Sequence, residues 1–277
     1  MTVHETIMAA LSEDIGNGDH SSLACIDPTI QGQMRLLAKA DGIIAGVDVA
    51  KEVLHCVDPA IVMEQFKNDG DEIHKGDVVF IIRGSSQKML TAERTLLNFM
   101  QRMSGIATAA KKYADVVKGT KTRILDTRKT TPNMRVFEKY AVQLGGCTNH
   151  RFGLFDMVML KDNHIDFAGG IEKAIDKTRN YLKNNNLDLK IEIETRSLEE
   201  VSRVINHGGV DRIMLDNFTP ALVKEAVQLI QGRYETEASG NITLDNLREY
   251  AEAGVDFISV GALTHHIASL DLSLKVF

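Results

Sequence analysis

The stretch that decides the fold covers residues 123–164, RILDTRKTTPNMRVFEKYAVQLGGCTNHRFGLFDMVMLKDNH. It contains two short apolar runs, at 123–125 and 157–160, and each ends abruptly in polar residues. Such runs are typical of buried parallel strands whose carboxyl ends open onto a site. Between them a helical stretch at 135–144 ends at a Gly-Gly pair, and His150 follows. We therefore expect the polar residues after both strands to share one site.

The same stretch is strongly basic. Between Lys121 and Lys161 eight lysines and arginines stand against three acidic residues, although the formal net charge of the whole chain is −6. The cationic or potentially cationic residues expected to converge are Arg128, Lys129, His150, Arg151 and Lys161. A solvated basic face is the alternative. Because these residues stand at strand ends and beside glycines, we favour a site for a ligand with several negative groups, which would compensate their repulsion.

Eight segments mark nearly the whole chain: TAERTLLNF, LDTRKTTP, NHR, MLKDNH, IEIET, MLDN, ASGN and VGALTH. In this order they resemble the quinolinate phosphoribosyltransferase family, the decarboxylating enzymes of NAD biosynthesis. The resemblance implies transfer of a phosphoribosyl group from phosphoribosyl pyrophosphate to quinolinate with decarboxylation, giving nicotinate mononucleotide, pyrophosphate and carbon dioxide. It also implies an α/β fold, an incomplete (β/α) barrel joined to an N-terminal α+β sandwich domain.

Length and composition limit the function classes. A chain of 277 residues is long enough for one large domain, or for a barrel and a smaller domain. Its mild acidity argues against a general nucleic-acid or membrane-surface binder. The chain contains no apolar run of about 18 residues and its N-terminus lacks the features of a signal peptide, so we expect a cytoplasmic protein. The spacing of Cys25, Cys56 and Cys147 indicates neither a disulfide framework nor a zinc site.

Residues 1–105 are expected to form the N-terminal domain. Its expected helices cover 3–11 and 47–56, and its expected strands cover 33–39, 61–66 and 78–83. The sequence GDEIHKGDVVFIIRG could suggest a lipoyl-type or biotinyl-type carrier, but it has no lysine in such a domain's modification motif. A long helical segment at 88–118, interrupted by Gly105, should link this domain to a catalytic domain at 106–267. The tail 268–277 has the period of a strand, and the resemblance implies that it returns to the N-terminal sheet.

A regular repeat begins at Arg123. The polar residues that close successive apolar runs are Arg128, Lys161, Glu194, Asp216, Ser239 and Gly261, spaced 33, 33, 22, 23 and 22 residues apart. Helical patterns at 198–206, 220–231 and 244–253 lie between them. This alternation is typical of a (β/α) barrel with its site at the carboxyl face of the strands. An open doubly wound sheet is the alternative, and the resemblance favours a barrel with fewer than eight strands.

Two features suit phosphoribosyl pyrophosphate. Glu194 and Asp216 end neighbouring strands, and paired carboxylates suit Mg²⁺, although both could instead be structural partners of the basic residues. Glu192 should face the same side as Glu194 and is a second candidate. Glycine-rich ends of the last two strands, at 239–241 and 260–262, suit a phosphate cradle. The family pattern has a second glycine where Asn241 stands, which puts the detailed amide geometry in doubt.

The resemblance implies roles for individual residues. The catalytic residues would be Lys129, Lys161, Glu194 and Asp216, and the last two would also hold the metal. The substrate-binding set would be Arg94, Thr127, Arg128, Lys129, His150, Arg151, Lys161, Glu194, Asp216, Ser239, Gly240, Asn241, Gly261 and His265. Arg94 would reach the substrate of a neighbouring subunit, so we expect a homodimer with shared active sites, possibly within a higher oligomer.

Four rival functions remain at this point. Two share the fold: a homologue associated with molybdenum transport, and a nicotinate-type transferase without decarboxylation. The full cationic set suits two substrate carboxylates and argues against both. The third is a Schiff-base lyase that uses Lys161, and the fourth is a non-catalytic sensor of a phosphate ligand.

Overall fold

The computed structural model describes residues 2–277 and divides into two compact units. Unit 1 comprises the chain up to Lys112 together with Thr130–Gly146 and Leu263–Phe277. Unit 2 comprises Tyr113–Lys129 and Cys147–Ala262. This division differs from the expected boundary at 105/106, because the helix α5 (Arg135–Leu144) groups with the N-terminal residues.

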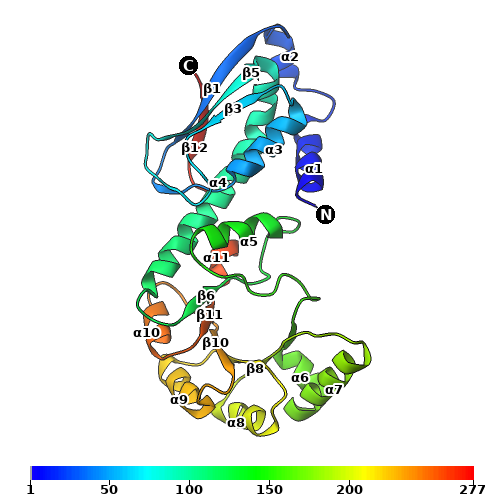
Figure 1. The fold of residues 1–277 in the computed structure, drawn as a ribbon, viewed down its shortest axis with the longest axis vertical. Coiled ribbons are helices and arrows are strands. Elements are labelled where there is room, and N and C mark those ends of the chain that lie inside the picture. Colours follow the sequence, from blue (N-terminus) through cyan, green and yellow to red (C-terminus); the bar gives the residue numbers. More distant parts are fainter. Residues whose placement is uncertain (1) are drawn as a thin grey trace. The chain divides into compact units, whose positions relative to one another are not determined.

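Unit 1 is built on a four-stranded antiparallel sheet in the order β12-β1-β5-β3 (Figure 1). These strands are β1 (Gln31–Ala38), β3 (Val62–Gln65), β5 (Val78–Ser85) and β12 (Leu272–Val276), and β2 (Gly42–Ile43) pairs with β4 (Glu72–Ile73) beside them. The three expected strands are confirmed to within a few residues. The C-terminal strand pairs with β1, with Leu274 opposite Leu36, as expected for the tail.

The helices of unit 1 are α1 (Val3–Ile15), α2 (His20–Cys25), α3 (Val47–Val57), α5 and most of α4 (Ser86–Val116). Thr2 and Glu5 form a capping box that begins α1. Ile7 of α1 and Val53 of α3 are fully buried where the two helices pack. Each such apolar side chain contributes about 1.5–3 kcal/mol when it leaves water. The first unit therefore has a core of its own.

The expectation that Gly105 interrupts the long helix is wrong, because α4 is continuous from Ser86 to Val116. Gly105 instead allows the chain at 267–269 to pass close to α4. A Cβ atom at this position would lie 2.4 Å from the backbone oxygen of Ala268. Since only glycine leaves room there, the chain at 267–269 can cross α4 before entering β12.

Unit 2 is a six-stranded parallel sheet in the order β6-β11-β10-β9-β8-β7. The strands are β6 (Arg123–Leu125), β7 (Val158–Leu160), β8 (Ile191–Thr195), β9 (Arg212–Asp216), β10 (Glu235–Ser239) and β11 (Phe257–Ser259). Their order never reverses as it does at the switch point of a doubly wound sheet. Within residues 2–277, β6 and β7 do not pair with each other. The sheet is thus an incomplete barrel of six strands, as the resemblance implies.

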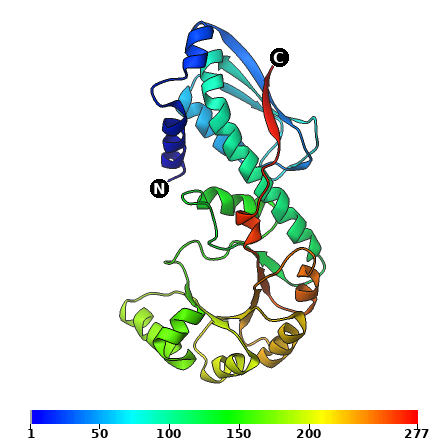
Figure 2. The ribbon, with the colours of Figure 1, turned by 180° about the vertical axis from the view of Figure 1, so that it is seen from behind.

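Helices on the outer side of this curved sheet connect the strands (Figures 1 and 2). They are α6 (Asp162–Ala168), α7 (Ile171–Asn184), α8 (Leu198–His207), α9 (Pro220–Ile230) and α10 (Leu247–Glu252), and α11 (Ala262–His265) follows β11. The helix expected at 244–253 is shorter, because Asn246 accepts a hydrogen bond from the Thr243 amide in a turn. In the described part of the chain no helix is long and apolar enough to cross a bilayer.

Candidate active site

Three charged side chains meet at the carboxyl ends of β7, β8 and β9. Lys161 Nζ forms an ion pair with Glu194 Oε1, and the Asp162 amide donates to Glu194 Oε2 at 3.2 Å. Burial and then the negative charge of Glu194 raise the pKa of Asp216, which places the two carboxylates near each other. The structure thus brings together the predicted pair of carboxylates and the predicted lysine.

This edge of the barrel fits a hard cation. Glu194 and Asp216 present carboxylate oxygens, the ligands that Mg²⁺ prefers together with water and substrate phosphates. The mutual repulsion that raises the pKa of Asp216 would be relieved by a bound cation. Lys161 already supplies one positive charge to Glu194, as the alternative of a structural partner among the basic residues expects for this carboxylate.

The basic loop after β6 lies beside the segment that precedes β7. Leu125 forms a parallel bridge with Thr148, and the fully buried Asp126 accepts from the His150 amide at 2.7 Å. Burial and then the charge of Arg128 lower the pKa of Arg151, so the two guanidinium groups are neighbours. Two of the five predicted cations therefore share one small region, held there by a buried carboxylate at the end of β6.

Thr127 and Lys129 stand on the same loop. The Lys129 amide donates to Thr127 Oγ1 at 3.0 Å, which stabilises the turn after β6. The Lys129 side chain is exposed, whereas Thr127 and Arg128 are half-buried. The exposed lysine can therefore reach a ligand from the solvent side of this edge.

The imidazole of His150 faces carboxylates in the interior of the barrel. Its Nε2 lies 3.0 Å from Glu192 Oε2 and 3.5 Å from Glu237 Oε2, and its Nδ1 accepts from the Arg151 amide. Arg212 Nη1 donates to Glu237 Oε2 at 2.9 Å and completes the cluster. His150 was expected among the converging cations, and the structure shows it already engaged by this buried set.

Burial and neighbouring charges shift the pKa values of His150 and Glu192. Burial alone would lower the pKa of His150, but hydrogen bonds and charges from Glu192 and Glu237 outweigh it and raise that pKa to about 9. Burial and the neighbouring Glu237 raise the pKa of Glu192 to about 7. Because His150 Nδ1 accepts from the Arg151 amide, the ring hydrogen of His150 lies on Nε2, which is 3.0 Å from Glu192 Oε2. Glu192 and Glu194 both face the interior of the barrel, and Glu192 lies beside His150 in the buried cluster.

Asn217 connects the carboxylate edge to the loop after β10. Its side-chain amide donates to Asp216 Oδ2 at 2.8 Å, and its backbone amide donates to Ser239 O at 2.8 Å. A Cβ atom on Gly240 would lie 2.2 Å from Asn217 Oδ1, and Gly240 has a φ of +96°. Both facts require glycine there. Asn217 was not predicted, and its place directly after Asp216 is the signal that could have found it.

Asn241 stands where the family pattern has a glycine, and its backbone explains why asparagine is accepted. Its φ is 52°, in the left-handed region that asparagine enters more readily than other residues with a side chain. The glycine-like turn is therefore kept. Gly261 follows β11, where the Val260 amide donates to Leu125 O at 2.9 Å. Ser239, Gly240, Asn241 and Gly261 thus lie at the ends of β10 and β11, the two strands that follow β6 in the order of the sheet.

Two predicted site residues belong to unit 1. Arg94 is exposed on α4, and His265 ends the short helix α11, where its ring contacts that of His266. Sequence reasoning missed the buried Glu237, whose signal is a charge in the middle of β10, and the half-buried Arg212, which begins β9.

Comparisons with known proteins agree along the chain. Residues 19–104 match the family described as "Quinolinate phosphoribosyl transferase, N-terminal domain", and residues 106–275 match its C-terminal domain. The chloroplastic nicotinate-nucleotide pyrophosphorylase [carboxylating] of Arabidopsis thaliana is 48% identical, over 98% of this chain and 81% of that protein. A probable enzyme of the same name from Bacillus subtilis is 41% identical, over 95% and 90%. The crystal structure of NadC from Streptococcus pyogenes superposes with a TM-score of 0.93 at 40% identity, covering 99% of this chain and 96% of that one.

Proposed function

The chain belongs to the quinolinate phosphoribosyltransferase family, and from that premise we propose how its residues transfer phosphoribosyl to quinolinate with decarboxylation. The substrates are quinolinate and phosphoribosyl pyrophosphate, and the products are nicotinate mononucleotide, pyrophosphate and carbon dioxide. The enzyme is thus a pentosyltransferase of NAD biosynthesis.

The observation that carries the assignment of residues is the neighbouring pair Arg128 and Arg151, close to the carboxylate edge of the barrel. Quinolinate has two adjacent carboxylates, and guanidinium groups match carboxylates in geometry and charge. Arg128 and Arg151 would bind these two carboxylates, and Lys161 would lie between the quinolinate and the ribose. His150 would not contact quinolinate. It would position Arg151, because its Nδ1 accepts a hydrogen bond from the Arg151 amide.

The carboxylates Glu194 and Asp216 would meet the ribose. They would bind its hydroxyl groups and stabilise the positive charge that develops on the ribosyl carbon as pyrophosphate leaves. These same two residues would hold Mg²⁺, which supplies charge neutralisation to the pyrophosphate when it is bound. Asn217 fixes the orientation of Asp216 through its side-chain amide.

The phosphate groups would bind at the glycine-rich strand ends. Backbone amides near Ser239, Gly240, Asn241 and Gly261 would hold the 5′-phosphate, with His265 near the same group. Thr127 and Lys129 would lie toward the pyrophosphate, which agrees with the exposure of the Lys129 side chain.

Carbon dioxide would leave after the transfer. The ring nitrogen is then cationic, and it stabilises the carbanion that remains when the bond to the neighbouring carboxylate breaks. This carbon then takes a proton from solvent, which gives the mononucleotide. The protein's task is to position that carboxylate, so Arg128 and Arg151 matter more than any general base.

Assembly and location are further parts of the proposal. Arg94 would complete the site of a second subunit, so the functional form would be a homodimer or a larger assembly of such dimers. A cytoplasmic location stays a prediction. The names of two plant relatives place those proteins in chloroplasts or mitochondria.

The test is to incubate the purified protein with quinolinate, phosphoribosyl pyrophosphate and Mg²⁺ and to follow carbon dioxide and the mononucleotide. We expect both products in equal amounts, and far slower use of nicotinate, which has one carboxylate. Equal use of nicotinate would contradict the assignment of the two arginines. Binding of phosphoribosyl pyrophosphate without release of pyrophosphate would instead indicate a sensor.

A further inference from the structure

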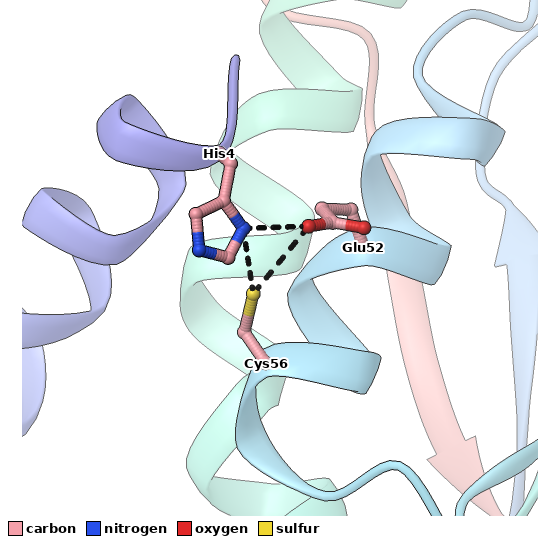
Figure 3. Close-up of side chains that lie close together, drawn as sticks. All are labelled: His4, Glu52 and Cys56. Atoms are coloured by element: carbon pink, nitrogen blue, oxygen red, sulfur yellow. Dashed lines mark hydrogen bonds and ion pairs between the residues drawn. The ribbon is translucent and has the colours of Figure 1, made fainter. Parts of the chain in front are cut away.

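A second group of potential ligands lies in unit 1, on the two helices α1 and α3 (Figure 3). His4 Nδ1 lies 2.8 Å from Glu52 Oε1, and Cys56 Sγ lies 3.8 Å from each of these two atoms. The three side chains point toward one another from two helices, as the close-up shows. Nothing in the transferase mechanism uses them.

The helices hold these side chains in place before any ligand arrives. Glu52 and Cys56 are four residues apart on α3, so they lie on the same face one turn apart. His4 stands in the first turn of α1, which the capping box of Thr2 and Glu5 fixes. The two helices contact each other, and Ile7 of α1 and Val53 of α3 are fully buried. A preformed arrangement reduces the entropy that a ligand must overcome.

The spacing of the three atoms fits a tetrahedral metal ion. Zinc–ligand distances of about 2.3 Å to sulfur and about 2.1 Å to nitrogen or oxygen give separations of about 3.6 Å from sulfur and about 3.4 Å between nitrogen and oxygen. The observed separations of 3.8, 3.8 and 2.8 Å differ from these by at most roughly 0.6 Å, within reach of small side-chain rotations. Thiolate and imidazole favour Zn²⁺ over Mg²⁺.

We propose that His4 Nδ1, Glu52 Oε1 and Cys56 Sγ bind a thiophilic divalent cation of the zinc type, at a site in unit 1 that is independent of the transferase site. When the ion binds, the thiol proton leaves to solvent. His4 Nδ1, which donates to Glu52 Oε1 in the free protein, also gives up its hydrogen to solvent, and the imidazole then binds the ion as the neutral tautomer that carries its proton on Nε2. Water supplies the fourth ligand. Solvent reaches the thiol, because Cys56 also lines an open cavity of about 370 Å³ together with Met8 and Leu11.

Cobalt is the probe that distinguishes this site from carboxylate sites. The reduced, chelator-treated full-length protein is titrated with Co²⁺ in the absence of Mg²⁺ and substrates. We expect a thiolate-to-cobalt charge-transfer band in the near ultraviolet that saturates at one equivalent and disappears when Zn²⁺ is added. Glu194 and Asp216 can bind Co²⁺ but cannot produce this band, because they contain no sulfur.

Matched variants assign the band to the three residues. Cys56→Ser should abolish it, and His4→Ala and Glu52→Gln should each require more Co²⁺ for saturation. The controls are Cys25→Ser, which removes an exposed thiol of unit 1, and His55→Gln, which changes the residue next to Cys56. Both should retain the band. Absence of a band in the unmodified protein, or its survival in Cys56→Ser, overturns the proposal. Circular dichroism verifies that each variant folds. If Cys56→Ser does not fold, the proposal is overturned when His4→Ala and Glu52→Gln both reach saturation at the same Co²⁺ concentration as the unmodified protein.

Discussion

At the scale of single residues, the candidate active site contains carboxylates that lie close together and are only partly neutralised by neighbouring cations. Asp216 is the clearest case, because burial and the charge of Glu194 both oppose its ionised form. Such an arrangement costs stability in the free protein and is favourable once a cation or a developing positive charge is present. We therefore expect Asp216 to contribute to catalysis rather than to stability.

Replacing Asp216 by asparagine should slow turnover by about two orders of magnitude, because loss of a transition-state interaction of about 3 kcal/mol has that effect. The free energy of unfolding should stay the same or rise, since the variant removes a repelled charge. Steady-state kinetics and urea unfolding measure the two quantities. Glu225→Gln, at an exposed position of α9, is the control. Full activity of Asp216→Asn would remove this residue from the mechanism.

The raised pKa of His150 predicts a pH dependence of stability. The pKa of His150 is about 9 in the folded protein and about 6.5 in an unfolded chain. A raised pKa gives stability that is fully present below about pH 6.5 and is lost as the pH rises through about 9. Because Glu192 shares the proton, we expect a contribution on the order of 2 kcal/mol.

The variant His150→Asn should therefore lose less stability than the unmodified protein between about pH 6.5 and 9.5, although it is less stable at the lower pH. Urea unfolding at several pH values in this window gives the comparison. His20→Asn, at the exposed start of α2, should keep the full pH dependence. If both variants show the unmodified slope, the buried cluster holds no additional proton.

At the scale of elements, one glycine shows how packing overrides helix propensity. Gly105 lies inside α4, where alanine alone would be favoured by about 1 kcal/mol. The backbone of Ala268 occupies the space that a methyl group would need. The crossing of the chain over α4 therefore depends on the absence of a side chain.

Gly105→Ala should lower the free energy of unfolding by about 1–3 kcal/mol, because the added methyl group forces the crossing segment to move. The exposed α4 position Asn98 provides the control, since Asn98→Ala should raise stability by a few tenths of a kcal/mol through propensity alone. Thermal and urea unfolding report the sign. If Gly105→Ala were more stable than the unmodified protein, the segment at 267–269 would move at little cost in free energy and the prediction would be wrong.

At the scale of the whole molecule, we expect Arg94 to act on the site of a second chain. It is exposed on α4 and belongs to unit 1, whereas Arg128, Arg151 and the carboxylates of Glu194 and Asp216 belong to unit 2. A two-fold dimer would make the exchange reciprocal, with each subunit completing the site of the other.

Mixing two inactive variants tests this arrangement. Arg94→Ala and Asp216→Asn subunits are unfolded and refolded together, and turnover is compared with each variant alone. About half of the dimers should be mixed, and each has one intact site, so recovery should approach about a quarter of the unmodified activity. An arginine that acts within its own chain predicts no recovery. Subunit exchange is verified with distinguishable tags, and exchange without recovered activity would contradict the proposal.

The sequence by itself determined the strands of the barrel and the residues that end them. Each apolar run and its closing polar residue are local features, so the ends of β6, β7, β8 and β9 could be predicted together with the residues that follow. The helix Arg135–Leu144 was predicted at its observed bounds for the same reason, since apolar periodicity and a glycine stop lie within one short stretch. The resemblance to the family supplied the incomplete closure of the barrel and the return of the C-terminal strand.

Only the tertiary structure decided the contacts between distant parts of the chain. The pairing of His150 with Glu192 and Glu237 joins residues from three segments, and no local pattern contains it. The same holds for the cluster of His4 with Glu52 and Cys56, because 48 residues separate His4 from Glu52 and the packing of α1 on α3 sets their distance. Local periodicity specifies which face of an element is buried, whereas packing selects which side chains meet.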